Sequence, residues 1–197
     1  MARQYFNSSS CDSVIVESAV TPTTVQTSFF SPYTLCNLAF PIGYGQSAPY
    51  AGQVYRFAMG GLITTPATGT LIITPFMGQG ASATSFTGAV NLGASPAQTV
   101  TASLSNIPWF VEGNIVFRSI SSVATSSTAW LSGHFFSQGT LATAGGGWNI
   151  PFGSVALVSV DTTGTVANSF GCLTFTMTFS VTGGTIKTEW TSMQSLN

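Results

Sequence analysis

One stretch near residue 175 alternates so strictly between apolar and hydroxyl side chains that it restricts what this chain can fold into. Between Gly171 and Val181, every second residue is apolar, and the residues between them are Cys, Thr or Ser. Successive side chains of a β-strand point to opposite faces, so the pattern predicts a strand with an apolar inner row and a hydroxyl outer row. A helix would instead spread the apolar residues around its whole circumference. We therefore expect the chain to be organised around a β-sheet.

The residues that follow predict a hairpin. Gly183-Gly184 can adopt the positive φ values of a tight turn between two antiparallel strands. The next run, Thr185–Met193, alternates in a way that places Ile186 and Trp190 on the same face. This pattern indicates a second strand, paired with the first, in which Trp190 belongs to the core.

The same interpretation extends along the chain. Gly60-Gly61 is expected to bend the backbone after a strand, and Gly145–Gly147 to start a loop that ends near Pro151. No segment shows sustained helical periodicity. We predict an all-β fold, an antiparallel, jelly-roll-like β-sandwich of about eight or nine strands, in a single domain 14–197 that follows an N-terminal arm, 1–13. Ten segments are candidates for these strands: 14–16, 24–30, 53–59, 70–76, 99–104, 109–120, 129–137, 155–160, 171–181 and 185–193.

The composition is nearly uncharged. Charged residues make up 5% of the chain, against about 25% in a typical soluble protein. The net charge of -1 provides no basic field for nucleic acid or for an anionic membrane. No apolar run in residues 1–13 resembles a signal peptide, which predicts synthesis in the cytoplasm. We interpret the chain as a protein that packs against other copies or partners; the alternative is an ordinary β-protein with a neutral hydroxyl surface.

Catalytic and metal-binding patterns are not found. The single histidine, His134, lies in a predicted strand and is interpreted as structural. The five carboxylates are scattered singly, and the three cysteines lack metal-type spacing, so we expect neither catalytic residues, nor a metal site, nor a cofactor. The cysteines, Cys11, Cys36 and Cys172, are expected to be unlinked. Trp109 fits the core like Trp190, and Trp130 fits either side of a sheet.

Several segments resemble structural proteins of tailed bacteriophages. The longest is Ser105–Ile120, and the order Gly52, Arg56, Gly60 before a strand is similar too. Two further segments agree with this resemblance: Val160-Asp161-Thr162-Thr163 with Ala167-Asn168, and Ser195-Leu196-Asn197. The resemblance covers the chain from about residue 50 onward.

The resemblance implies a non-enzymatic virion protein with a jelly-roll-like fold, a capsid decoration or cement protein that commonly forms trimers. Such a protein would bind the major capsid protein on the outer surface of the head after synthesis in the host cytoplasm, without binding nucleic acid or membrane. The alternative is a phage fibre or spike-type receptor-binding protein whose loops, Met77–Ser85 or Leu141–Trp148, recognise a host-surface glycan. A small glycan hydrolase is a third possibility, against which the scattered acids argue.

Four residues are predicted to contact a partner. Arg3, Tyr5 and Phe6 lie in the arm 1–13, which reaches about 43–47 Å when extended. Tyr and Phe bury large areas at interfaces, and Arg pairs with carboxylates, so the arm is expected to help hold the protein on its particle. The alternative is a frayed end. The fourth residue is Trp148, which follows the glycine-rich segment.

Overall fold

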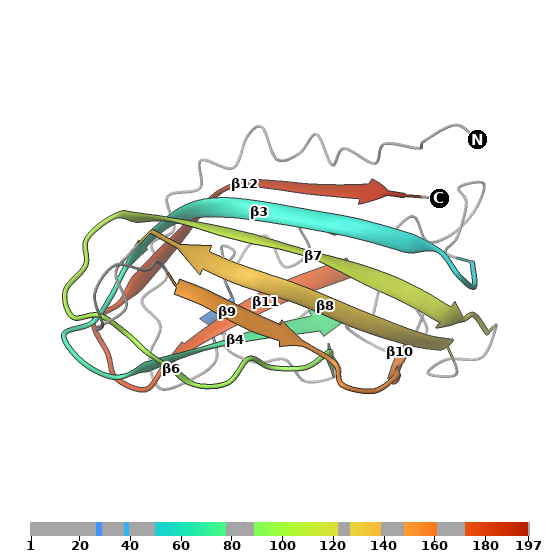
Figure 1. The fold of residues 1–197 in the computed structure, drawn as a ribbon, viewed down its shortest axis with the longest axis horizontal. Helices are drawn as coiled ribbons and strands as arrows, with labels where there is room; N and C mark the ends of the chain where they lie inside the picture. Colours follow the sequence, from blue (N-terminus) through green and yellow to red (C-terminus); the bar gives the residue numbers. More distant parts are fainter. Residues whose placement is uncertain are drawn as a thin grey trace.

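Two antiparallel sheets make up the fold. The computed structural model describes residues 27–28, 38–39, 50–77, 89–121, 127–138, 148–160 and 172–196. These residues contain twelve strands and no helix, and the strands form two six-stranded sheets in separate layers (Figure 1). The prediction of an all-β, antiparallel sandwich is confirmed. The arm 1–13 and the predicted strand 14–16 lie outside the described residues.

Sheet A carries the longer strands. β9 and β10 both pair with the edge of β8 that is not occupied by β7. The remaining order is β12, β3, β7 and β8, as Figure 1 shows from top to bottom. The strands are β3 (Val54–Thr64), β7 (Ile107–Ser119), β8 (Ser127–Ser137), β9 (Trp148–Gly153), β10 (Val158–Val160) and β12 (Thr185–Ser195).

Sheet B is centred on two strands. β11 pairs with β4 over seven residues, from Leu173 opposite Met77 to Phe179 opposite Leu71. Four strands of two residues each flank this pair, and because such short pairings leave no alternating pattern, the total exceeds the eight or nine strands expected. The strands are β1 (Thr27–Ser28), β2 (Leu38–Ala39), β4 (Thr70–Met77), β5 (Val90–Asn91), β6 (Gln98–Thr99) and β11 (Cys172–Phe179).

The predicted hairpin at Gly183-Gly184 is wrong. β11 pairs with strands of sheet B, whereas β12 pairs with β3 in sheet A, so residues 180–184 form an arch from one sheet to the other. Gly183 does have a positive φ of 104°. The arch is favoured because the apolar rows of both strands then face each other across the core. β3 and β4 form a second arch beside it, where the Ser180 hydroxyl accepts a 2.8 Å hydrogen bond from the Thr70 amide.

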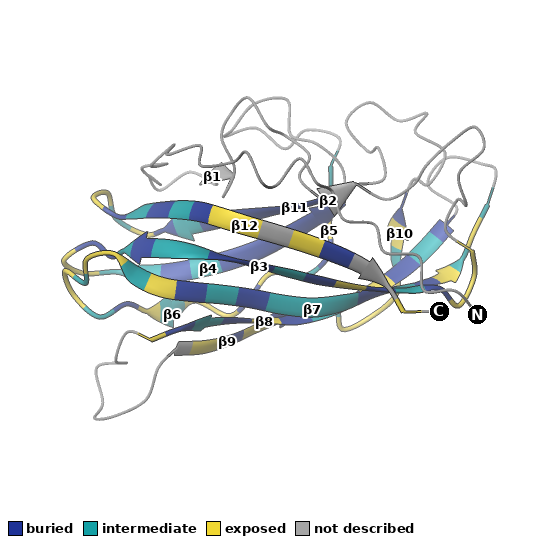
Figure 2. Cartoon of the chain, turned by 90° about the horizontal axis from the view of Figure 1, so that it is seen from above, coloured by how far each residue is buried: buried dark blue, intermediate teal, exposed yellow. Residues whose placement is uncertain are grey.

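The core lies between the sheets and is rich in aromatic rings. Inward residues alternate with outward ones along β3, β7 and β8, as predicted, and Figure 2 shows the resulting alternation of burial. Phe57 of sheet A lies 5.2 Å from Phe175 of sheet B, measured between ring centroids. Trp109 is buried as expected, and its ring stacks on Phe135 at 5.7 Å.

The hydroxyl row of β11 is not a solvent-facing row throughout. Thr174 and Thr176 are buried, contrary to the prediction, whereas Ser180 is exposed. β11 has paired strands on both sides, and the Thr176 hydroxyl donates a 3.4 Å hydrogen bond to the Thr74 carbonyl. Buried hydroxyls are tolerated where they have such partners.

Two predictions that were based on glycine and proline are wrong. Gly60-Gly61 does not bend the chain, because β3 continues through both residues and pairs with β7 and β12 there. The expected loop near Pro151 is β9, which pairs with β8 on one side only in the described part of the chain. An edge strand tolerates proline because its outer amides need no partner in the sheet.

Candidate functional site

The solvent-facing side of sheet A, which we call the outer face, carries exposed aromatic, polar and aliphatic side chains. Cross-strand pairing aligns its side chains in rows that run from β12 to β8 or β9. One row joins Trp190, Gly60, Phe110, Phe136 and Asn149. Another, six residues further along β7, joins Val54, Val116 and Trp130. At about 3.4 Å per residue, the two rows lie about 20 Å apart.

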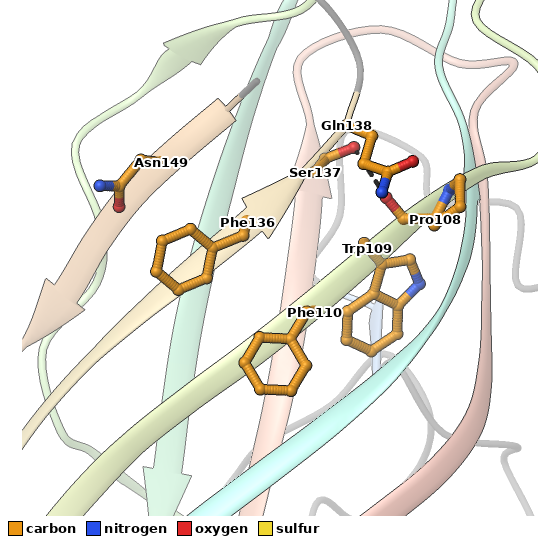
Figure 3. A pocket seen from close by; sticks show the side chains of 7 residues that line it. All are labelled: Pro108, Trp109, Phe110, Phe136, Ser137, Gln138 and Asn149. Carbon is orange, nitrogen blue, oxygen red and sulfur yellow. Dashed lines mark hydrogen bonds between the residues drawn. The ribbon is translucent and has the colours of Figure 1, made fainter. Parts of the chain in front are cut away.

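The first row contains an aromatic groove. The groove has a volume of about 640 Å³, and Figure 3 shows Phe110 and Phe136 projecting from the adjacent strands β7 and β8. Their ring centroids are 6.3 Å apart, with an interplanar angle of 31°. The groove is lined by Pro108, Trp109, Phe110, Phe136, Ser137, Gln138 and Asn149. None of these side chains is charged.

Trp190 extends the row of rings toward β12. Its ring centroid lies 5.6 Å from that of Phe110, and the side chain is 43% exposed. The prediction that Trp190 belongs to the core is therefore wrong. The register of β12 against β3 shifts between Thr188 and Trp190, which inserts Glu189 as an extra residue and turns Trp190 to the outer face. β-Bulges redirect side chains in this way.

Gly60 makes room for the redirected indole. A Cβ atom added to Gly60 would lie 2.7 Å from the Trp190 Nε1 atom, closer than real Cβ contacts. Glycine is therefore required at this position of β3 if the indole is to lie over the strand. The bulge in β12 and the missing side chain at Gly60 together allow the Trp190 ring to lie close to the sheet.

His134 and Asn149 close the other end of the row. The His134 Nδ1 atom donates a 2.8 Å hydrogen bond to Asn149 Oδ1, and the His134 ring stacks against Phe136 at 5.8 Å. Because Oδ1 accepts this bond, the amide NH₂ of Asn149 is the part that can donate to a ligand. His134 is exposed and holds the surface amide of Asn149. The interpretation of His134 as a structural residue stays a prediction.

The middle of the outer face is polar and electrically balanced. Arg56 Nη2 lies 2.8 Å from Glu112 Oε2, and both side chains are substantially exposed. They line a hollow of about 480 Å³ together with Asn114 and His134. Asn114 Oδ1 is buried without a hydrogen-bond partner in the described part of the chain. The pair leaves the centre of the face without net charge.

The far end of sheet A is apolar, and we call it the apolar end. Leu157 precedes β10, which pairs with the start of β8 beside Trp130, and Leu196 follows β12 beside Val54. Tyr50 and Ile120 flank the same end, because Gly52 and Ser119 contact the last residues of β7 and the first of β8. All five are exposed, at 37–55%: Tyr50, Ile120, Trp130, Leu157 and Leu196. Clustered exposed hydrophobic side chains are typical of interaction surfaces.

The predicted contact residues are only partly placed by the structure. Arg3, Tyr5 and Phe6 lie outside the described residues, as do most of the two loops named as glycan sites. The backbone of Trp148 opens β9 and pairs with Ser137, which lines the aromatic groove. Its role as a contact residue remains a prediction, now with a described groove beside it.

Sequence reasoning did not find the aromatic groove. The alternation in β7 and β8 contains the signal, since Phe110 and Phe136 occupy the outward phase of otherwise well-patterned strands. An aromatic residue at an outward position of a long strand is a candidate contact residue. The bulge at Glu189 left no comparable signal, so the face to which Trp190 points was not predictable.

No protein-family model, curated protein or solved structure was found to match this chain. Within the described residues, His, Cys, Asp and Glu do not gather in groups of three or more that would hold a metal ion. The described residues also contain no helix long and apolar enough to span a membrane. The geometry of the outer face is therefore the basis for the functional proposals.

Proposed function

We propose that this protein is a non-enzymatic structural protein of a tailed-phage virion, which decorates or cements the outer surface of the head. It binds the major capsid protein and self-associates as a homotrimer, after synthesis in the host cytoplasm, and needs neither nucleic acid nor membrane. The observation that carries the proposal is the apolar end, where five large hydrophobic side chains are exposed together. The resemblance of the sequence to phage structural proteins supports it.

The low charge of the chain fits such a role. Interface cores are depleted in charged residues, because each buried charge must be desolvated. With 5% charged residues, this protein covers a large area against a capsid subunit while desolvating few charges. Trp130 and Leu157 are the natural anchors, since truncating a few buried aromatic and aliphatic residues removes most of the binding energy in typical interfaces.

Co-sedimentation with empty heads of the virus that encodes the protein tests this proposal. We expect Trp130→Ser and Leu157→Ser each to weaken head binding by about tenfold or more, because each removes an apolar anchor. Trp190→Ser is the matched control, since it removes an equally exposed indole from the other end of the same sheet. Failure of the unaltered protein to bind heads, or equal losses in all three variants, would count against docking through the apolar end.

A second candidate is a fibre or spike-type protein that recognises a host-surface glycan. The specific observation in its favour is the aromatic groove, where rings and an amide lie side by side. Such a protein would bind glycans and leave empty heads unbound, so the co-sedimentation experiment separates the two candidates.

A further inference from the structure

We propose that the aromatic groove of sheet A is a binding site for a neutral glycan chain. The site goes beyond decoration of the head, and it would exist on the isolated protein whatever its place in a particle. Four features of the groove support the proposal: the continuity of its rings, its hydrogen-bonding rim, its lack of charge and its construction.

The rings form a continuous strip across the sheet. Trp190, Phe110 and Phe136 follow one another at centroid distances of 5.6 and 6.3 Å, and the His134 ring stacks beside Phe136 on the same strand, β8. Because neighbouring strands lie about 4.8 Å apart, the four strand positions from β12 to β8 span about 14 Å. Sugar rings present a face of C–H groups that packs on aromatic rings, and the strip is long enough for more than one sugar.

Hydrogen-bonding groups lie at the rim of the strip. The Asn149 amide is exposed, and its hydrogen bond with His134 fixes its orientation. A ligand that binds the NH₂ group therefore loses little side-chain entropy at this residue. Gln138 is exposed on the other side of the groove, after the end of β8. Ligand sites typically combine apolar walls with a few placed polar groups of this kind. The hydroxyl rim of a sugar suits amides, which both donate and accept.

The absence of charge favours a neutral ligand over an anionic one. No charged side chain lines the aromatic groove, and the nearest pair, Arg56 and Glu112, neutralise each other at 2.8 Å. A phosphate, a sulfate or a sialic acid would find no charged side chain among the residues that line the groove, and the neighbouring Lys187 and Glu189 of β12 carry opposite charges. A neutral hexose chain requires none.

The strip depends on two local features that a plain sheet does not need. The bulge at Glu189 turns Trp190 outward, and Gly60 leaves the space over which the indole lies. Gly interrupts a strand at a cost in stability, and a bulge disrupts the ladder, so both are explained most simply by the exposed ring that they position.

Titration of the full chain with neutral linear hexasaccharides of glucose, mannose and N-acetylglucosamine tests the proposal. Calorimetry and the change in tryptophan fluorescence are the readouts. We expect at least one probe to bind with a Kd of about 0.1–1 mM. Phe110→Ala, Phe136→Ala and Asn149→Ala should each weaken binding by about tenfold or more. Trp130→Ala, at the apolar end, should bind as the unaltered chain does.

The experiment also separates other occupants. A sialylated hexasaccharide and an apolar peptide are added as further probes. Binding of either in place of the neutral sugars would overturn the proposal, as would no binding up to about 10 mM. Binding that survives all three groove substitutions would also overturn it. Asn149 is exposed, so its variant keeps the test decisive if a phenylalanine variant fails to fold. A variant that loses glycans but still binds heads would separate this site from the proposed docking end.

Discussion

Tyr55 is an ionisable side chain that the core encloses completely. Its ring meets Phe117 edge to face at 6.1 Å, and none of its surface is exposed. Burial, and to a lesser extent the neighbouring Tyr50, raises the pKa of Tyr55 from 10.0 to about 12. The folded state therefore holds the phenolic proton more tightly than the unfolded state does.

Alkaline destabilisation follows from this pKa. Stability linked to Tyr55 is fully present below pH 10 and is lost as the pH rises from about 10 to about 12. The loss amounts to about 2–3 kcal/mol in the free energy of unfolding. Urea unfolding at a series of pH values measures it. Tyr55→Phe should largely remove this loss of stability at alkaline pH, whereas Tyr50→Phe, at an exposed position, should largely retain it. An equal loss in the unaltered chain and in Tyr55→Phe would contradict the assignment to Tyr55.

Gly113 and Gly133 face each other on the inner side of sheet A. The space above them is taken by phenylalanine: a Cβ atom on Gly133 would lie 2.6 Å from the Phe152 ring and 2.8 Å from the Glu112 carbonyl oxygen. Phe152 in turn stacks near Phe57 at 6.4 Å. The two glycines are therefore sites of close approach, which is one of the few reasons for glycine inside a strand.

We expect Gly133→Ala to destabilise the fold by about 1–3 kcal/mol, because the added methyl group overpacks the core against a ring and a backbone oxygen. Chemical denaturation gives the value. Ser132→Ala, at the neighbouring outward position, is the matched control and should change stability by less than about 0.5 kcal/mol. A Gly133→Ala protein as stable as the control would show that the Phe152 ring shifts at little cost to make room for the methyl group.

The bulge in β12 determines which side chains this strand presents to each face. Beyond Glu189, Trp190 and Ser192 point outward, and Met193 is buried at 4% exposure. Deleting Glu189 removes the extra residue, so Trp190 then follows Thr188 in regular alternation and the side chains beyond it keep their faces. Deleting Ser192, which lies beyond the bulge, instead moves Met193 to the outer face.

The Glu189 deletion should therefore change the free energy of unfolding by less than about 1 kcal/mol, whereas the Ser192 deletion should cost about 1.5–3 kcal/mol because it exposes Met193. Chemical denaturation gives both values. The quenching of Trp190 fluorescence by iodide, measured as the difference from a Trp190→Phe background, should be unchanged by the Glu189 deletion. Reduced quenching after this deletion would show that Trp190 has left the outer face.

The sequence predicts the strands well where both faces leave a pattern. β7, β8 and β11 alternate clearly, and the structure has each of them close to the expected bounds. β9 was not predicted because Pro151 and Gly153 interrupt its short apolar pattern. The arch at Gly183 was not predicted because a turn signal does not reveal whether the next strand joins the same sheet. The aromatic groove depends on which outward residues become neighbours, and only the register of several strands determines that.

At the scale of the whole molecule, the scarcity of charge predicts self-association. A net charge of -1 gives little mutual repulsion, and the apolar end exposes hydrophobic side chains that a symmetric contact would cover. We expect the isolated protein to be a trimer. Light scattering at micromolar concentration measures the mass, and a clean monomer near 20.4 kDa would contradict this expectation.

The two neighbouring arches also have a consequence during synthesis. The Thr176 hydroxyl bonds to the Thr74 carbonyl across 102 residues of chain, so β4 must wait for β11 before sheet B can form. At about 5–20 residues per second, a ribosome needs about 5–20 s to produce that interval. For that time β4 has only two-residue strands to pair with among the described ones. The nascent chain is thus most exposed to aggregation before its final arch emerges, and its rate of translation helps to set the yield of folded protein.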